Sequence, residues 1–224
     1  MNFLLCQVGA FAAWFVYGSF FEWVFHKYLF HSPKIIPATY KAHAITHHGM
    51  YRGDDSYDLP SEDDPHGHHI MMDWFALPLF IGFHLPFIFL VQKLTGIPSI
   101  WGAVASIVVY YACYEGMHYV MHVPRDRWIE RTRVFRFLNE HHRLHHKNHD
   151  TNLNVVFPLA DLLLRTLRTH RMRRKVIQPA PSTDTATVRA TRQFTSWSRR
   201  PFSPDAAIEW SIPWPSTWWR AASG

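Results

Sequence analysis

The hydrophobic residues in the first half of the chain gather in three long runs, at residues 3–25, 74–92 and 99–117. The first run has one formal charge, Glu22, and is long enough to cross the roughly 30 Å hydrocarbon core of a bilayer as a helix. No basic segment precedes it, which disfavours a cleaved signal peptide. The runs predict an all-α integral membrane protein, and three buried helices of a soluble protein are the alternative.

The second and third runs predict a membrane hairpin. Pro78 and Pro86 interrupt the second run, and the segment between the two runs contains Gly96 and Pro98, which favour a turn. A hairpin returns the chain to the membrane face from which it came. Lys93 is the one basic residue in the turn, and the segments on either side of the hairpin are richer in Lys and Arg. The positive-inside rule therefore predicts that these segments form a helical cap on the cytosolic face.

Beyond residue 168 the pattern changes. Residues 169–224 show no helical or strand period and are rich in Arg, Pro, Ser, Thr and Trp. Such a composition is typical of disordered segments. It predicts a membrane-embedded domain at 1–168 followed by a basic, disordered tail at 169–224. The formal net charge of +6 fits the cytosolic loops of a membrane protein better than it fits a nucleic-acid-binding protein.

Histidine is the residue type that suggests chemistry. The chain has 17 histidines, and most of them cluster after the first and third apolar runs. Cys6 and Cys113 lie apart inside apolar runs, so they offer neither a disulfide framework nor a zinc-finger spacing. The candidate metal ligands are therefore imidazoles: His26, His31, His43, His47, His48, His118, His122, His142, His145 and His146.

The spacing of these residues bears on how many ions they hold. Residues three or four apart share a helix face. Three sets are therefore each expected to direct two rings to one point: His43 with His47, His118 with His122, and two of the three residues His142, His145 and His146. Ten ligands exceed what one tetrahedral or octahedral ion can take. The count predicts a dinuclear site.

Two other spacings bear on how the ions share their ligands. His26 and His31, five residues apart, lie about 140° apart around a regular helix. They are expected either to serve different ions or to straddle a helix end. Adjacent histidines point about 100° apart, which suits two neighbouring ions. Two such pairs lie among the candidate ligands, His47–His48 and His145–His146.

Other side chains are weaker candidates. Residues that could support the ligands through hydrogen bonds are Glu22, Glu115, His141 and His149. Of these, Glu115 is expected to orient His118 through the second ring nitrogen. We expect a surface position or a channel lid for His66, His68 and His69, and a hydrogen bond in helix packing for His84. No role is assigned to His170.

The ligand type narrows the metal and the reaction. Imidazole suits Zn, Fe, Ni and Cu(II), and the H-E-x-x-H motif of hydrolytic zinc enzymes does not occur. A histidine-rich dinuclear iron site beside a bilayer fits the use of O2 to attack an unactivated C–H bond, with apolar helices positioning a lipid chain. Zinc can replace iron in a purified sample, because it binds such sites more tightly than Fe(II) does.

Four motifs carry a resemblance to a known family. EWVFHKYLFH, HAITHH, HYVMH and NEHHRLHH, followed by NVVFPLADLLLRTL, resemble the fatty acid hydroxylase and sterol desaturase superfamily of membrane-bound, histidine-rich di-iron oxygenases. The resemblance covers about residues 14–168 and points most toward fatty acid 2-hydroxylases. It implies two iron ions held by the ten histidines, O2 as co-substrate, hydroxylation of a fatty acyl chain, and two electrons from an external donor.

The chain departs from this pattern in three places. Some relatives carry a fused haem domain of the cytochrome b5 type, whereas this chain opens directly into a membrane run. A separate reductant, similar to cytochrome b5 or ferredoxin, is therefore implied. The insert at 52–69 and the tail after 168 do not match the pattern.

Two rival functions stay open. Carotenoid hydroxylases of the same broad superfamily share an H-K-Y-x-x-H start and a late H-R-x-H-H, so the substrate could instead be a carotenoid or a sterol. A membrane metal-binding or transport protein is the rival from another class. Transporters usually place their ligands near the bilayer midplane, whereas these histidines are predicted at helix ends on one side.

Overall fold

The computed structural model describes residues 2–58 and 69–169. The chain divides into two units, Met1–Pro179 and Ala180–Gly224, and all described residues belong to the first. These residues form helices and no strand, which confirms the predicted all-α class. The predicted tail at 169–224 lies, apart from its first residue, outside the described residues.

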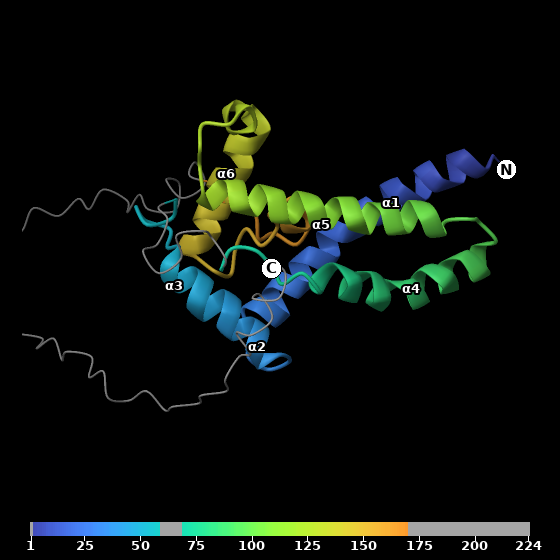
Figure 1. The fold of residues 1–224 in the computed structure, drawn as a ribbon, viewed down its shortest axis with the longest axis horizontal. Helices are drawn as coiled ribbons and strands as arrows, with labels where there is room; N and C mark the ends of the chain where they lie inside the picture. Colours follow the sequence, from blue (N-terminus) through green and yellow to red (C-terminus); the bar gives the residue numbers. More distant parts are fainter. Residues whose placement is uncertain (1, 59–68, 170–224) are drawn as a thin grey trace, which may run out of the picture. The chain divides into compact units, whose positions relative to one another are not determined.

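Three long helices run through the unit: α1 (Phe3–Phe25), α4 (Ala76–Thr95) and α5 (Ile100–His122). α5 packs against both α1 and α4, and Figure 1 shows α4 and α5 joined as a hairpin. Gly96 ends α4 with a φ of 68°, a conformation that favours glycine, and its N–H donates to the Gln92 carbonyl at 2.8 Å. The hairpin therefore turns where the sequence predicts.

α1 and α5 approach each other closely at two glycines. A Cβ at Gly18 would lie 2.7 Å from the Tyr110 ring, and one at Gly102 would lie 2.1 Å from the Gln7 carbonyl oxygen. The Gln7 side chain also holds the hairpin turn, because it donates to the Pro98 carbonyl at 2.6 Å and accepts from the Gly102 N–H at 2.7 Å. Small residues at such contacts are typical of helix packing in membranes. Both helices start beside the hairpin turn and run in the same direction.

Two helices are long and apolar enough to cross a membrane: α4, and α1 extended to Phe30. Pro78 lies in the first turn of α4, where its missing N–H leaves no gap in the hydrogen bonding, and the helix continues through Pro86. α5 has the same length as α1, 23 residues, but does not reach the same hydropathy. Its four tyrosines and Glu115 lower its mean hydropathy, so the third predicted span lacks this support.

Seven further elements complete the described part of the unit. They are the π-helical turns η1 (His26–Phe30) and η2 (Lys41–His47), the 3₁₀ turn η3 (Trp128–Arg131), and the helices α2 (Pro37–Tyr40), α3 (His48–Met50), α6 (Arg133–Lys147) and α7 (Leu159–Leu163). Thr132 caps α6, and its hydroxyl accepts from the Phe135 N–H at 3.1 Å. A buried cluster joins η1, α5 and α6 through Phe30, Tyr114, Met121, Phe135 and Leu138. This cluster fixes α6 against the ends of α1 and α5.

Candidate metal centre

All ten histidines predicted as ligands lie together where α1 and α5 end. They form two groups, and within each group the candidate ligand nitrogens lie within 4.8 Å of one another. Site A consists of His26, His31, His43, His48 and His145. Site B consists of His47, His118, His122, His142 and His146. All are buried except His31, which is half-buried, and each group could hold a metal ion.

Site A is built on two π turns. His26 and His31 flank η1, where the His31 N–H donates to the His26 carbonyl at 3.1 Å. His43 and His48 are related in the same way in η2, where the His48 N–H donates to the His43 carbonyl. A bond from residue i to residue i+5 brings residues five apart onto one face of the turn. Of the two alternatives expected for His26 and His31, the one in which they serve different ions is wrong, because the π turn brings both rings to site A. The other alternative is confirmed, since His31 lies just past the helical turn that ends at Phe30.

The irregular backbone also corrects the pairing expected for His43 and His47. On a regular helix they would share a face, whereas His43 belongs to site A and His47 to site B. On α6, His142 and His146 both belong to site B and His145 belongs to site A, so this set directs two of its rings to one point, as expected. The two adjacent pairs among the ligands, His47–His48 and His145–His146, each divide between the two sites, as a separation of about 100° predicts.

Backbone carbonyls orient five of the ten rings. Each bond runs from Nδ1–H to a carbonyl oxygen: His26 to Leu153 (2.6 Å), His145 to Thr151 (2.9 Å), His118 to Ile70 (3.0 Å), His122 to Tyr57 (2.7 Å), and His146 to Tyr51. Only a protonated nitrogen can donate to a carbonyl, so Nε2 of each neutral ring is unprotonated. This tautomer presents the Nε2 lone pair to the centre of the site, as histidine ligands do in metal sites.

The ring nitrogens of site B face one another rather than hydrogen-bond donors. His142 Nε2 lies 3.2 Å from His122 Nε2 and 3.0 Å from His146 Nε2. Both neighbours offer lone pairs, and His142 Nε2 carries at most one proton, so at least one of these contacts is not a hydrogen bond. His118 Nε2 is buried without a hydrogen-bond partner in the part of the chain that the structure describes. A cation among these nitrogens would satisfy all of them.

Site A has the same kind of geometry. His43 Nε2 lies 3.0 Å from His26 Nε2 and 3.1 Å from His48 Nε2, and His31 Nε2 lies 3.0 Å from His145 Nε2. Two ligands at a right angle, with metal–nitrogen bonds of about 2.1 Å, are about 3.0 Å apart. The separations in both sites therefore match those of neighbouring ligands on one ion, and the residues present fit a metal.

Burial keeps these rings in the form that binds metal. Loss of solvation lowers the pKa of His142, His145 and His146 well below the usual histidine value, and neighbouring imidazoles lower it further. Burial and the nearby His149 lower the pKa of His31 to about 3. Because metal binds the neutral imidazole, the ligands are ready for an ion at neutral pH.

No match was found when the chain was compared with protein-family models, curated proteins and solved structures. The resemblance of its motifs to the fatty acid hydroxylase superfamily therefore stays a prediction. The two histidine sites and the residues that support them are the features of this chain that bear on its function.

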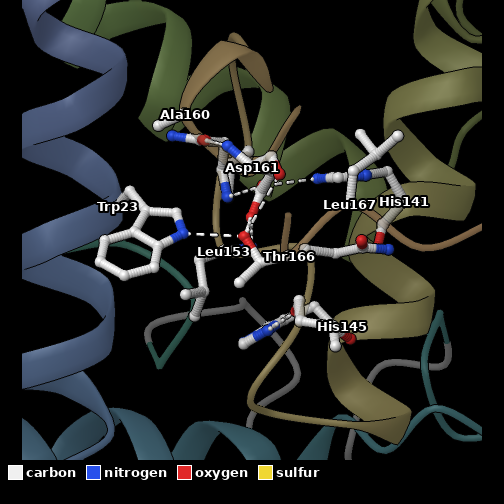
Figure 2. Close-up of polar contacts among 12 residues, drawn as sticks. Trp23, His141, His145, Leu153, Ala160, Asp161, Thr166 and Leu167 are labelled. Atoms are coloured by element: carbon white, nitrogen blue, oxygen red, sulfur yellow. Dashed lines mark hydrogen bonds and ion pairs between the residues drawn. The ribbon is translucent and has the colours of Figure 1, made fainter. Parts of the chain in front are cut away.

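A buried carboxylate supports the centre, and the spacing of the histidines gives no sign of it. Asp161, in α7, accepts hydrogen bonds from His141 Nε2 (3.0 Å), the Leu153 N–H (2.9 Å), the Asn154 N–H (2.8 Å) and the Thr166 hydroxyl (2.6 Å). Figure 2 shows these contacts meeting at the carboxylate. Burial alone would raise the pKa of Asp161, but the hydrogen bonds, with that from His141 the strongest, hold it below its usual value. The carboxylate is therefore charged at neutral pH.

Asp161 fixes the segment that orients a ligand of site A. The N–H of Leu153 donates to Asp161, and the carbonyl of Leu153 accepts from His26. Trp23 of α1 joins the same network through its Nε1–H, which donates to the Thr166 hydroxyl at 2.9 Å. The sequence marks Asp161 only as a lone acidic residue within the apolar stretch VVFPLADLLL. That signal is too weak to separate it from a surface residue.

Glu22, expected as a supporting residue, acts on the same segment rather than on a histidine. Its carboxylate accepts from the Tyr110 hydroxyl at 2.6 Å, from the Val155 N–H at 2.5 Å and from the Asn154 side chain at 3.1 Å. These bonds tie α1 and α5 to the residues that follow Leu153. Glu22 therefore braces the backbone that orients His26.

Glu115 does not make the contact expected of it. Its carboxylate accepts from the Met72 N–H at 3.0 Å. The Nδ1–H of His118 donates to the Ile70 carbonyl instead. The expectation that Glu115 orients His118 directly is therefore wrong, because a backbone carbonyl takes that position. Glu115 holds the short segment from which the carbonyl comes.

The two other supporting candidates differ from each other. His141 is buried and bound to Asp161, so it points away from both sites. His149 is exposed, and its ring centroid lies 5.1 Å from that of His31 and 4.3 Å from that of His48. His149 therefore forms part of the rim of site A.

The remaining histidines lie outside the two sites or outside the described residues. His69 is exposed. His84 is buried in α4, where its Nδ1–H donates to the Phe80 carbonyl at 2.7 Å. This hydrogen bond lies within one helix, not between two. Three histidines lie outside the described residues: His66, His68 and His170.

Proposed function

We propose that this chain is a membrane-bound oxygenase that uses two iron ions to hydroxylate a C–H bond of a lipid, most naturally a fatty acyl chain. The observation that carries the proposal is the interleaving of the two sites. His145 and His146 are neighbours on α6, yet they belong to different sites, and His47 and His48 divide in the same way. Two ions held by adjacent residues would lie close enough together to act on one O2 molecule.

The proposed reaction uses one O2 and two electrons. A C–H bond of the lipid breaks, one oxygen atom enters the product as a hydroxyl group, and the other leaves as water with two protons. Bound iron would supply the redox chemistry, since imidazole ligands suit Fe(II) as well as Zn. The chain's own residues hold the ions, and backbone carbonyls fix the ring orientations. The electrons come from an external donor, similar to cytochrome b5 or ferredoxin.

The surfaces of α1 and α4 support a lipid as substrate. Large apolar side chains are exposed along both helices, among them Leu5 (68 %), Leu79 (62 %) and Leu94 (76 %). Apolar surface of this extent is typical of a membrane contact. An apolar cavity lined by residues of these helices reaches His26 of site A. In this proposal the distribution of Lys and Arg places the sites on the cytosolic side, where a soluble donor has access.

Reconstitution with iron tests the proposal. Iron is added to the purified protein without oxygen, and isotopically labelled O2 and a reductant follow, with fatty acids, sterols and carotenoids as candidate substrates. Mass spectrometry is expected to find an acyl product that carries one labelled oxygen atom. A hydroxylated sterol or carotenoid instead would show that the substrate is a sterol or a carotenoid rather than a fatty acyl chain. The absence of any oxygenated product from protein with both sites full of iron would overturn the proposal.

Three single substitutions sharpen the test. His118→Ala in site B and His145→Ala in site A are each expected to abolish the product, because each removes a ligand of one ion. His66→Ala is the control, because the sequence predicts a surface position or a channel lid for His66 rather than a ligand position, and it is expected to keep most of the activity. Equal loss in all three variants would contradict the division of roles proposed here.

A further inference from the structure

An apolar cavity of about 80 Å³ lies among α1, α4 and α5. On α1 its wall includes Trp14, Gly18, Phe21, Phe25 and His26, which are three or four residues apart except for the adjacent Phe25 and His26, and so form one face of the helix. Trp14 and His26 are twelve residues apart, or about 18 Å along the helix. The cavity therefore follows α1 from within the apolar span to a ligand of site A.

One polar group of the cavity wall has no partner. His84 of α4 lines the cavity and is 2 % exposed. Its ring packs edge-on against Tyr17 and Phe21, with centroid distances of 5.6 and 4.5 Å. Its Nδ1–H donates to the Phe80 carbonyl, so Nε2 is an unprotonated acceptor. Among residues 2–58 and 69–169, His84 Nε2 has no hydrogen-bond partner.

Two other polar residues of the cavity wall are bound to each other. Glu22 and Tyr110 also line the cavity, and the Tyr110 hydroxyl donates to the Glu22 carboxylate at 2.6 Å. A buried acceptor without a donor is unfavourable, and buried polar groups nearly always have a partner. The partner that His84 Nε2 lacks must be a hydrogen-bond donor that enters the cavity.

We propose that the cavity is the lipid slot of the oxygenase, and that His84 accepts a hydrogen bond from a hydroxyl group on the bound lipid. This inference rests on the proposed function and narrows the substrate class to lipids that already carry a hydroxyl group. An acceptor nitrogen selects a hydroxyl over a ketone or ether oxygen, because these oxygens cannot donate.

The position of the hydroxyl group follows from the helix geometry. His84 packs against Tyr17 and Phe21, which precede His26 by nine and five residues, or roughly 8–14 Å along α1. An extended chain advances about 1.2 Å per bond. The hydroxyl group therefore lies roughly six to eleven bonds from the carbon that is oxidised.

Equilibrium binding tests the inference without turnover. Purified protein, with no reductant present, is titrated with stearate, with monohydroxystearates that differ in the carbon bearing the hydroxyl, and with the matching ketostearates. At least one hydroxy isomer is expected to bind roughly three- to tenfold more tightly than stearate and than its ketone, as one hydrogen bond in a buried site implies. If no isomer is preferred, or if the ketone binds as tightly, water or nothing pairs with His84 and the inference is overturned.

Variants of His84 locate the effect. His84→Phe keeps an aromatic ring but removes the acceptor, so the ratio of hydroxystearate affinity to stearate affinity is expected to fall to about one. His84→Gln keeps an acceptor near the same place and is expected to restore part of the preference. Phe87→Leu, at an exposed position of α4, is the control and should keep the full preference. A preference that survives in His84→Phe would also overturn the inference.

The two proposals fail separately. If the hydroxyl preference depends on His84 but no lipid is oxygenated, the proposed function is wrong and the binding site stands. If stearate is oxygenated but no hydroxy isomer binds more tightly, the oxygenase stands and the role of His84 is wrong.

Discussion

Site A and site B contain the same number of histidines but stand on different backbones. Site B takes pairs of histidines four residues apart from α5 and from α6, where a regular helix places both rings on one face. Site A takes pairs five residues apart from η1 and η2, where the backbone is π-helical. Regular helices thus supply four of the five histidines of site B, and the π turns with their end residues supply four of the five of site A; His47 of η2 and His145 of α6 are the exceptions.

The two sites also differ in how far they are buried. All members of site B are buried, whereas His31 of site A is half-buried and His149 lies exposed beside it. The apolar cavity reaches site A at His26. π-helical turns occur often at functional sites. In the proposed oxygenase, site A would hold the ion that the substrate approaches, and site B would hold the enclosed second ion.

The largest effect is expected from His142→Ala. Its Nε2 lies within 3.2 Å of two other ring nitrogens of site B, so its loss opens the enclosed site. We expect one ion to be lost and the product to fall to background. Metal analysis of the purified variant checks this. In the matched variant of site A, His31→Ala, site B should keep its ion, and two ions retained in His142→Ala would contradict the distinction.

Acid should destabilise the metal-free protein. His142, His145 and His146 stay neutral in the fold because burial lowers their pKa, whereas in the unfolded chain they take up protons below about pH 6.5. The unfolded state therefore binds more protons, and stability is lost as pH falls below about 6.5, by about 1.4 kcal/mol per pH unit for each ring. Thermal unfolding between about pH 7 and about pH 5 measures this loss.

Single-ring variants test whether rings of both sites cause the pH dependence. His142→Phe and His31→Phe are each expected to flatten the dependence by a similar amount, because the pKa of His31 in the fold is about 3 and that of His142 is also held well below its usual value by burial. Stability that rises on acidification would mean that the rings are charged in the fold. That result would contradict the neutral ligand state of both sites.

The sequence carries more information about which residues gather than about how they divide. The spacing argument, together with the family resemblance, points to ten histidines, and the structure brings all ten together. The division into sites depends on two π turns, and periodicity arguments assume a regular helix of 3.6 residues per turn. The prediction that His43 and His47 direct their rings to one point was wrong for that reason. The adjacent pairs were placed correctly because neighbours diverge on either kind of helix.

The supporting residues were harder to predict because their contacts are distant in sequence. A residue pattern does not show which backbone carbonyl will accept a hydrogen bond. The Ile70 carbonyl accepts from His118 in the place expected for the Glu115 carboxylate. Asp161 acts through Leu153 on His26, 135 residues away from itself in the chain. No local spacing encodes that contact, and only the packed fold reveals it.

A moderate effect is expected from Asp161→Asn. The amide cannot accept all four hydrogen bonds with the strength of a carboxylate, so the carbonyl of Leu153 that orients His26 is less well fixed. Loss of such support typically costs about 10- to 100-fold in metal affinity or activity. Metal titration should show this loss at site A and a smaller one at site B. Asp150→Asn, at an exposed position, is the control, and an equal loss at both sites would show general unfolding instead.

The smallest effect is expected from His149→Ala. Its ring contacts those of His31 and His48 but is itself exposed, and surface substitutions usually change free energies by less than about 0.5 kcal/mol. Activity and metal affinity at site A should therefore fall by less than about threefold. Metal titrations of His149→Ala and His31→Ala compare the metal affinity of site A after the loss of either of two neighbouring rings. A loss as large as that of His31→Ala would make His149 a ligand, and site A would then have six histidines against five in site B.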